Sequence, residues 1–156
     1  MKLCIFSNAI GEIHSGHILS IASISRYAKI CNADYIVNKK IVLGNQYTGM
    51  EKFLMYKMLE KYDRILYLDT DILVHPCALD IFKTLNETPL PYMFNESFTN
   101  REYDLRVIRR RLTEVAKINP KLTRLRKILE DEQINYYYNA GVILINRENK
   151  DLSKVS

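Results

Sequence analysis

Short blocks of apolar residues alternate along the chain with segments in which apolar residues recur every three or four positions. The clearest blocks are 3–6, 35–37, 65–68 and 142–145. Continuous apolar runs of this length are typical of strands that are buried on both faces of a parallel sheet. The segments with helical spacing lie between these blocks and predict covering helices. The pattern therefore indicates an α/β fold, a mainly parallel sheet flanked by helices.

Local signals set the bounds of several expected elements. Thr48 with Glu51 three residues later forms a capping box, which predicts a helix that runs to about Tyr62. The strongest strand begins at Arg64 and is expected to continue through Val74, because Pro76 ends it. The other expected elements are strands at 2–7, 35–37 and 142–145, helices at 18–28 and 79–85, a loop or brief strand at 39–46, a strand with a loop at 89–100, and two helices within 102–130 that separate near 119–120.

Length and composition are those of one globular domain, which we place at residues 1–156. The chain has 156 residues, of which 47% are hydrophobic and 26% charged. This mixture excludes a disordered chain and supports one buried core. No apolar run approaches the roughly 20 residues that span a bilayer, and the first apolar run is too short for a signal peptide. We expect a cytoplasmic protein.

The three cysteines, Cys4, Cys31 and Cys77, lie far apart and form no CxxC pair. Neither a disulfide framework nor a zinc site is indicated by this spacing. We expect all three to be small buried apolar residues.

The net charge of +5 comes from one basic segment. Residues 101–130 carry ten lysines and arginines against four acids, and the rest of the chain is nearly balanced. The cluster Arg109, Arg110 and Arg111 could face a phosphorylated or membrane-borne acceptor, with peripheral membrane contact, or could be a solvated helix face. Only Tyr103 interleaves with these charges, so nucleic acid is an unfavoured partner.

Two carboxylates follow the apolar run 65–68 of the strongest strand, in Asp69-Thr70-Asp71. In extended backbone, residues two apart point to the same side, so both carboxylates are expected to converge while Thr70 faces away. Ligands of open α/β sheets bind at the carboxyl ends of the strands. Two hard oxygen ligands there suit Mg²⁺ or Mn²⁺ held jointly with substrate phosphates. An isolated pair of this kind can also simply cap or turn the chain.

Several segments together resemble a known family. The stretch YDRILYLDTDILV looks like the metal-binding segment of nucleotide-sugar glycosyltransferases with the GT-A fold, most closely glycosyltransferase family 8. The helix TGMEKFLMYKMLEKY resembles the one before that family's DxD, with Lys52 at the position of a donor-contacting basic residue. Ser7-Asn8 is similar to the segment that cradles the nucleotide, and Tyr138-Asn139-Ala140-Gly141 to the family's donor-sugar motif.

The resemblance implies a GT-A-like, Rossmann-like domain that transfers a sugar from a nucleotide-diphosphate donor, a UDP-sugar by preference, to an acceptor hydroxyl. It implies Mn²⁺ or Mg²⁺ at Asp69 and Asp71, retention of the anomeric configuration, and a glycan, lipid-linked or protein acceptor. Donor contacts fall on Ser7, Asn8, Lys52, Asp69, Thr70, Asp71, Asn139, Ala140 and Gly141. No residue is assigned as catalytic nucleophile or base.

The chain departs from the family pattern at its carboxyl end. The family continues into an Asp-Gln segment and a late histidine that completes the metal site, and neither follows Gly141 here. Asp131-Glu132-Gln133 precedes the motif and is interpreted as a helix end, and neither His75 nor the His14–His17 pair is expected to bind metal.

Two other functions stay open. One is a phosphatase of the haloacid dehalogenase type, in which the first aspartate is a nucleophile. That class usually opens with its DxD strand and has Thr where this chain has Leu73. The other is a carboxyl-terminally short transferase relative that only binds.

Overall fold

A computed structural model describes residues 1–44, 48–85, 91–95 and 138–148. Residue contacts divide the chain into two units, Met1–Met93 with Ala140–Ser156, and Phe94–Asn139. The second unit lies almost entirely outside the described residues, and so do the two helices expected within 102–130. The single-domain assignment therefore stays a prediction. No helix in the described ranges is both long enough and apolar enough to span a membrane.

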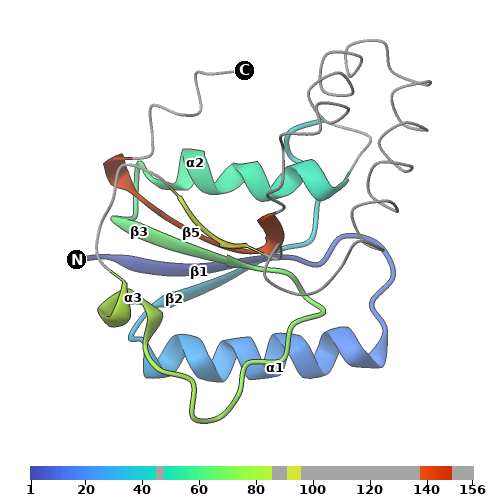
Figure 1. The fold of residues 1–156 in the computed structure, drawn as a ribbon. Helices are drawn as coiled ribbons and strands as arrows, with labels where there is room; N and C mark the ends of the chain where they lie inside the picture. The colour runs from blue at the N-terminus through green and yellow to red at the C-terminus, as the bar shows by residue number, and fades with distance from the viewer. Residues whose placement is uncertain (45–47, 86–90, 96–137, 149–156) are drawn as a thin grey trace, which may run out of the picture. The chain divides into compact units, whose positions relative to one another are not determined.

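The described elements alternate between strand and helix, as the apolar pattern predicts. They form one five-stranded sheet in the order β2-β1-β3-β5-β4 (Figure 1). In chain order they are β1 (Leu3–Asn8), α1 (Ser15–Ile30), β2 (Asp34–Asn38), the 3₁₀ helix η1 (Thr48–Phe53), α2 (Leu54–Met58), β3 (Arg64–Leu68), α3 (Ile81–Thr84), β4 (Tyr92–Asn95) and β5 (Tyr138–Asn146).

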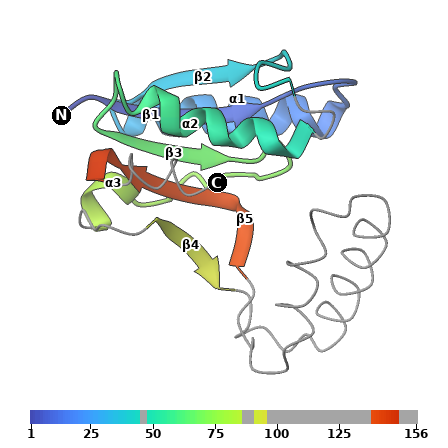
Figure 2. The ribbon, with the colours of Figure 1, turned by 90° about the horizontal axis from the view of Figure 1, so that it is seen from above.

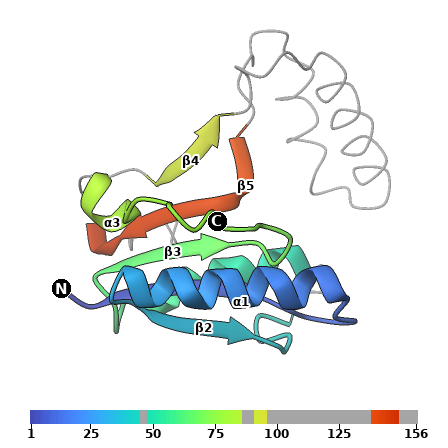
Figure 3. The same cartoon turned by 90° about the horizontal axis from the view of Figure 1, so that it is seen from below.

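Helices α1 and α2 cover opposite faces of the sheet (Figures 1 and 3). Successive side chains of the central strands therefore enter different cores. In β3, Ile65 and Tyr67 join Met55 in the core under α2, whereas Leu66 and Leu68 join the core that includes Ile24 of α1. Burial on both faces explains why the sequences of these strands are continuously apolar and do not alternate between apolar and polar residues.

The direction of β5 decides what meets at the carboxyl edge of the sheet. Strands β2 and β3 pair with β1 in parallel, whereas β5 pairs with β3 in antiparallel orientation, with Leu68 opposite Val142 (Figure 2). The start of β5 therefore lies beside the end of β3. A parallel β5 would have carried Tyr138–Gly141 to the opposite edge.

Three predicted elements differ clearly from the structure. The strand expected at 142–145 begins at Tyr138, so that the motif before Val142 is part of β5. Strand β3 ends at Leu68 instead of continuing through Val74, because the chain turns at Asp69. The helix expected from Thr48 is a 3₁₀ turn followed by a short α-helix, and its capping box is not formed with Glu51. Both carboxylate oxygens of Glu51 instead accept hydrogen bonds from the backbone N–H groups of Val42 and Leu43, at 3.0 and 2.8 Å.

Two of the three cysteines are buried, as expected, and one is not. Burial raises the pKa of the Cys4 thiol to about 12 and that of Cys31 to about 11, so both stay protonated and unreactive. The prediction was wrong for Cys77, which is exposed in the surface turn after Pro76, where it joins neither core.

Candidate functional site

The end of β3 and the start of β5 bring two distant motifs into contact. The backbone N–H of Asp69 donates to the carbonyl oxygen of Gly141 at 2.9 Å. This bond extends the antiparallel pairing of the two strands by one step beyond Leu68. Residues more than 70 positions apart, both chosen from the sequence as donor contacts, are thus neighbours.

Lys52, in the 3₁₀ helix η1, contacts the same two strands, β3 and β5. Its ammonium nitrogen donates to the carbonyl oxygen of Ala140 at 2.9 Å and lies 5.1 Å from the centre of the Tyr67 ring. The side chain is half-buried, so its position is held by a hydrogen bond and a cation–π contact rather than left to solvent. Lys52 is thus positioned by contacts within the fold and is not a freely solvated surface lysine.

Tyr67 is a member of the site that the sequence analysis missed. Its hydroxyl donates to Oδ1 of Asp69 at 2.5 Å. Burial raises the pKa of Tyr67 well above its usual range, and the negative charges of Asp69 and Asp71 raise it further. The phenol therefore stays protonated and acts as a donor. Alternation along a strand could have revealed it, because residues 67 and 69 share a face.

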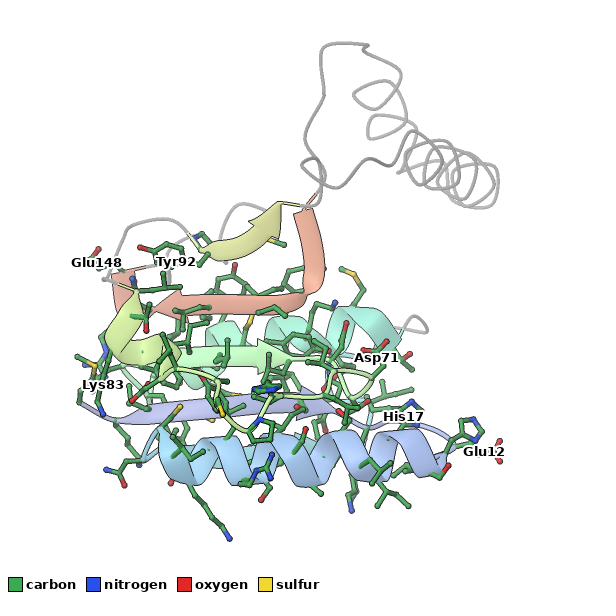
Figure 4. The ribbon with its side chains drawn as sticks, turned by 60° about the horizontal axis from the view of Figure 1, so that its bottom comes forward. Glu12, His17, Asp71, Lys83, Tyr92 and Glu148 are labelled. Carbon is green, nitrogen blue, oxygen red and sulfur yellow. The ribbon has the colours of Figure 1, made fainter. Side chains whose placement is uncertain are left out.

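The Asp69-Thr70-Asp71 segment is a turn rather than extended strand. The Ile72 N–H donates to the Asp69 carbonyl at 3.3 Å, and the Thr70 hydroxyl donates to the Asn8 carbonyl at 3.2 Å. The extended geometry assumed from the sequence therefore does not hold at Thr70, which is tied to the end of β1. Asp69 is half-buried and Asp71 is exposed. Figure 4 shows Asp71 at the same end of the molecule as His17, far from Lys83 and Glu148.

Ser7 and Asn8, at the end of β1, differ in accessibility. The Ser7 side chain is completely buried and accepts a 3.4 Å hydrogen bond from Tyr35, so it is not presented to a ligand here. The Asn8 side-chain oxygen accepts from the Asn38 amide at 3.1 Å. Its own amide nitrogen is buried and has no hydrogen-bond partner among the described residues. The Asn8 amide is close enough to the Tyr67 hydroxyl to act against the rise in the pKa of that phenol.

The two carboxylates at this edge of the sheet would suit a divalent cation whose remaining ligands come from a bound substrate and water. No cluster of three or more His, Cys, Asp or Glu side chains able to hold a metal occurs within the described residues. Asp69 and Asp71 remain as two carboxylates, and Oδ1 of Asp69 accepts the hydrogen bond from Tyr67. Magnesium characteristically takes one or two protein carboxylates and fills the remaining positions with phosphate oxygens and water.

The three histidines have local structural partners. Nδ1 of His17 accepts from the backbone N–H of His14 at 3.1 Å, which caps the start of α1. Nδ1 of His75 accepts from the backbone N–H of Cys77 at 3.1 Å within a surface turn.

Some predicted residues are beyond the described part of the site. The backbone of Asn139 belongs to β5, and its amide contact with a donor sugar stays a prediction. Arg109, Arg110 and Arg111, and the Asp131–Gln133 segment, lie outside the described residues.

Comparison with known proteins gives a family and a fold. Residues 12–155 match glycosyl transferase family 8. A glycosyltransferase involved in the glycosylation of the major capsid of PBCV-1 superposes with a TM-score of 0.60 at 13% identity, covering 99% of this chain and 64% of that one. The galactosyltransferase LgtC, crystallised with donor and acceptor sugar analogues, gives 0.49 at 14% identity, covering 94% and 58%. A search of curated protein sequences found no match.

These comparisons confirm the predicted α/β, GT-A-like fold and the predicted family resemblance. The chain spans less than two thirds of the length of either compared structure.

Proposed function

The chain belongs to glycosyl transferase family 8, and from that premise we propose that it binds a nucleotide-sugar together with a divalent cation and transfers the sugar to an acceptor hydroxyl. Asp69 and Asp71 are the proposed cation ligands. The donor contacts are proposed for Lys52, Asn8, Thr70 and the 139–141 segment, with Ser7 as a buried support behind them.

One observation carries this proposal: a closed set of contacts links the candidate residues. The backbone N–H of Asp69 donates a hydrogen bond to Gly141, and the Lys52 ammonium group donates one to the neighbouring Ala140. The Tyr67 ring makes a cation–π contact with Lys52, and its hydroxyl donates to Asp69. Three segments that are remote in sequence thus fix the position of a carboxylate and an ammonium group. Positioning of this kind is what transfer of a bound sugar requires.

The chain supplies binding and electrostatics at the leaving group. A bound Mn²⁺ or Mg²⁺ would offset the negative charge that develops on the diphosphate as the glycosidic bond breaks. Tyr67 donates to Oδ1 of Asp69 and so orients this carboxylate, which would hold the cation together with Asp71. Lys52 uses one N–H on Ala140 and retains two for the donor.

Finer points of this proposal rest on the family resemblance. These are a UDP-sugar donor, retention of configuration and a glycan, lipid-linked or protein acceptor, for which Arg109, Arg110 and Arg111 are the proposed anionic-acceptor surface. No catalytic nucleophile or base is assigned. The family match favours a transferase over the phosphatase alternative.

A ligand screen by thermal unfolding tests the proposal. We expect one of UDP-, GDP- or ADP-sugars to stabilise the protein only when Mn²⁺ or Mg²⁺ is present, by about 2.7 kcal/mol at a hundredfold excess over Kd. Nucleotide release from the same donor then separates an enzyme from a relative that only binds. Absence of any metal-dependent stabilisation would contradict the proposal.

The Tyr67→Phe substitution should weaken cation binding in the presence of the nucleotide about 10- to 100-fold, because it removes the donor that orients Asp69. Titration of Mn²⁺ into the protein with UDP measures the effect. Tyr62→Phe is the matched control, since Tyr62 is also buried and donates to an aspartate, Asp34, at 2.8 Å. If both variants lose the same affinity for Mn²⁺, Tyr67 has no specific role at the proposed cation site.

A further inference from the structure

A groove with a basic rim lies between the edge strand β2 and helix α2. None of the proposed donor contacts lines it, but one lining residue, Asn38, donates a hydrogen bond to Asn8 of the proposed donor site at 3.1 Å. The volume of the groove is about 570 Å³. Phe6, Ile36, Leu54 and Met58 form its apolar floor. Figure 2 shows β2 at the border of the sheet, with α2 lying across the neighbouring strands.

Three lysines, Lys39, Lys40 and Lys57, are the charged residues that line this groove within the described part of the chain. No carboxylate accompanies them in that lining. All three lysines are exposed. The groove is therefore lined by positive charge and no carboxylate above an apolar floor, which favours an anionic partner.

Directly after the two rim lysines, the chain exposes three consecutive apolar side chains, Ile41, Val42 and Leu43, hereafter the apolar loop. Their exposed fractions are 51%, 59% and 36%. Single exposed apolar residues are ordinary on protein surfaces, but three in a row beside a basic groove form a contiguous patch.

The apolar loop is held in place by a buried carboxylate. Glu51 is completely buried, and its two oxygens accept hydrogen bonds from Val42 and Leu43 at 3.0 and 2.8 Å. Hydrogen bonds to a charged acceptor are stronger than neutral ones. The loop is thus fixed with its side chains outward, although burying them would have been favourable.

We propose that the apolar loop and the groove lysines together form a docking surface for an anionic lipid bilayer. A bilayer presents anionic headgroups directly above acyl chains, so that the lysines meet phosphates while the loop enters the interface. A soluble polyanion would match the lysines and leave the apolar loop unused. An apolar protein surface would match the loop and leave three charges uncompensated.

Sedimentation with lipid vesicles tests this surface. The full chain should bind vesicles of phosphatidylcholine mixed with phosphatidylserine much better than vesicles of phosphatidylcholine alone, and salt should weaken the binding. The double substitution Lys39→Glu with Lys40→Glu should lower the partition coefficient about 25-fold, on the basis of roughly fivefold per lysine near an anionic surface.

A matched charge control separates the groove from the net charge of the protein. Lys29→Glu with Lys61→Glu makes the same change in net charge at two other exposed positions. We expect this control to lose much less binding than the groove variant. Equal losses in the two variants, or no binding of the unmodified chain to anionic vesicles, would overturn the proposal.

An environment-sensitive dye reports which face enters the lipid. In a Cys77→Ser background, where the remaining cysteines are buried, the dye is attached at Val42→Cys or, as control, at the exposed Ala22→Cys on α1. Emission should shift to the blue on anionic vesicles only for the Val42 label. A shift at Ala22, or none at Val42 while the protein sediments, would assign docking to another face.

A nucleotide readout distinguishes this surface from the proposed donor site. The Lys39 and Lys40 variant should keep the metal-dependent thermal shift with the nucleotide-sugar. Loss of that shift would reassign the groove to the donor and overturn the lipid proposal.

Discussion

Replacing Asp69 or Asp71 by asparagine is expected to abolish metal-dependent stabilisation by the nucleotide-sugar and to lower the rate of donor turnover by about 10²- to 10³-fold, the range found when one group that stabilises developing charge is removed. Asparagine keeps the size of the side chain but removes the negative charge that a hard cation requires. Thermal unfolding and nucleotide release measure the two effects.

The control for these variants is Glu148→Gln. Glu148 is an exposed carboxylate at the end of the molecule opposite Asp71 (Figure 4), and its loss makes the same change in net charge. We expect it to retain both the stabilisation and the turnover. If the unmodified chain binds the nucleotide with metal and the Asp69 and Asp71 variants do so equally well, these residues are not the cation ligands.

The Leu66→Ala substitution is expected to lower the free energy of unfolding by about 2–5 kcal/mol, the range for large-to-small changes in well-packed cores. Leu66 is 1% exposed in the centre of β3 and packs with Ile5, Ile24 and Leu144 in the core on the α1 side. Urea denaturation measures the change. Asp69 directly follows β3, and Leu66 faces the other core, so the same variant should weaken nucleotide binding only to the extent that it unfolds the protein.

Leu79→Ala makes the identical chemical change where the side chain is 77% exposed. Its backbone carbonyl, which accepts a hydrogen bond from Tyr27, is unaffected by the substitution. We expect a change within about 0.5 kcal/mol. A similar cost at both positions would mean that β3 is not the buried centre of the sheet.

The positions of Asp69 and Gly141 in the fold could be predicted because each directly adjoins a continuous apolar run, 65–68 for Asp69 and 142–145 for Gly141. The turn at Thr70 could not, since it depends on the carbonyl of Asn8, which arrives from β1. Glu51 was assigned to a capping box from its spacing to Thr48, yet a buried carboxylate satisfies the nearest free N–H groups. Those belong to Val42 and Leu43.

The amino-acid sequence by itself determined the α/β class, the two-sided burial of the central strands and the placement of two carboxylates at a strand end. These three features follow from local patterns, because the spacing of apolar residues indicates whether a strand is buried on one face or on both. Tertiary structure alone decided that β5 runs antiparallel to β3 and that Lys52 and Tyr67 meet there. A strand that is apolar on both faces is buried equally well whether it runs parallel or antiparallel to its neighbour. Its sequence therefore does not show at which edge of the sheet it starts.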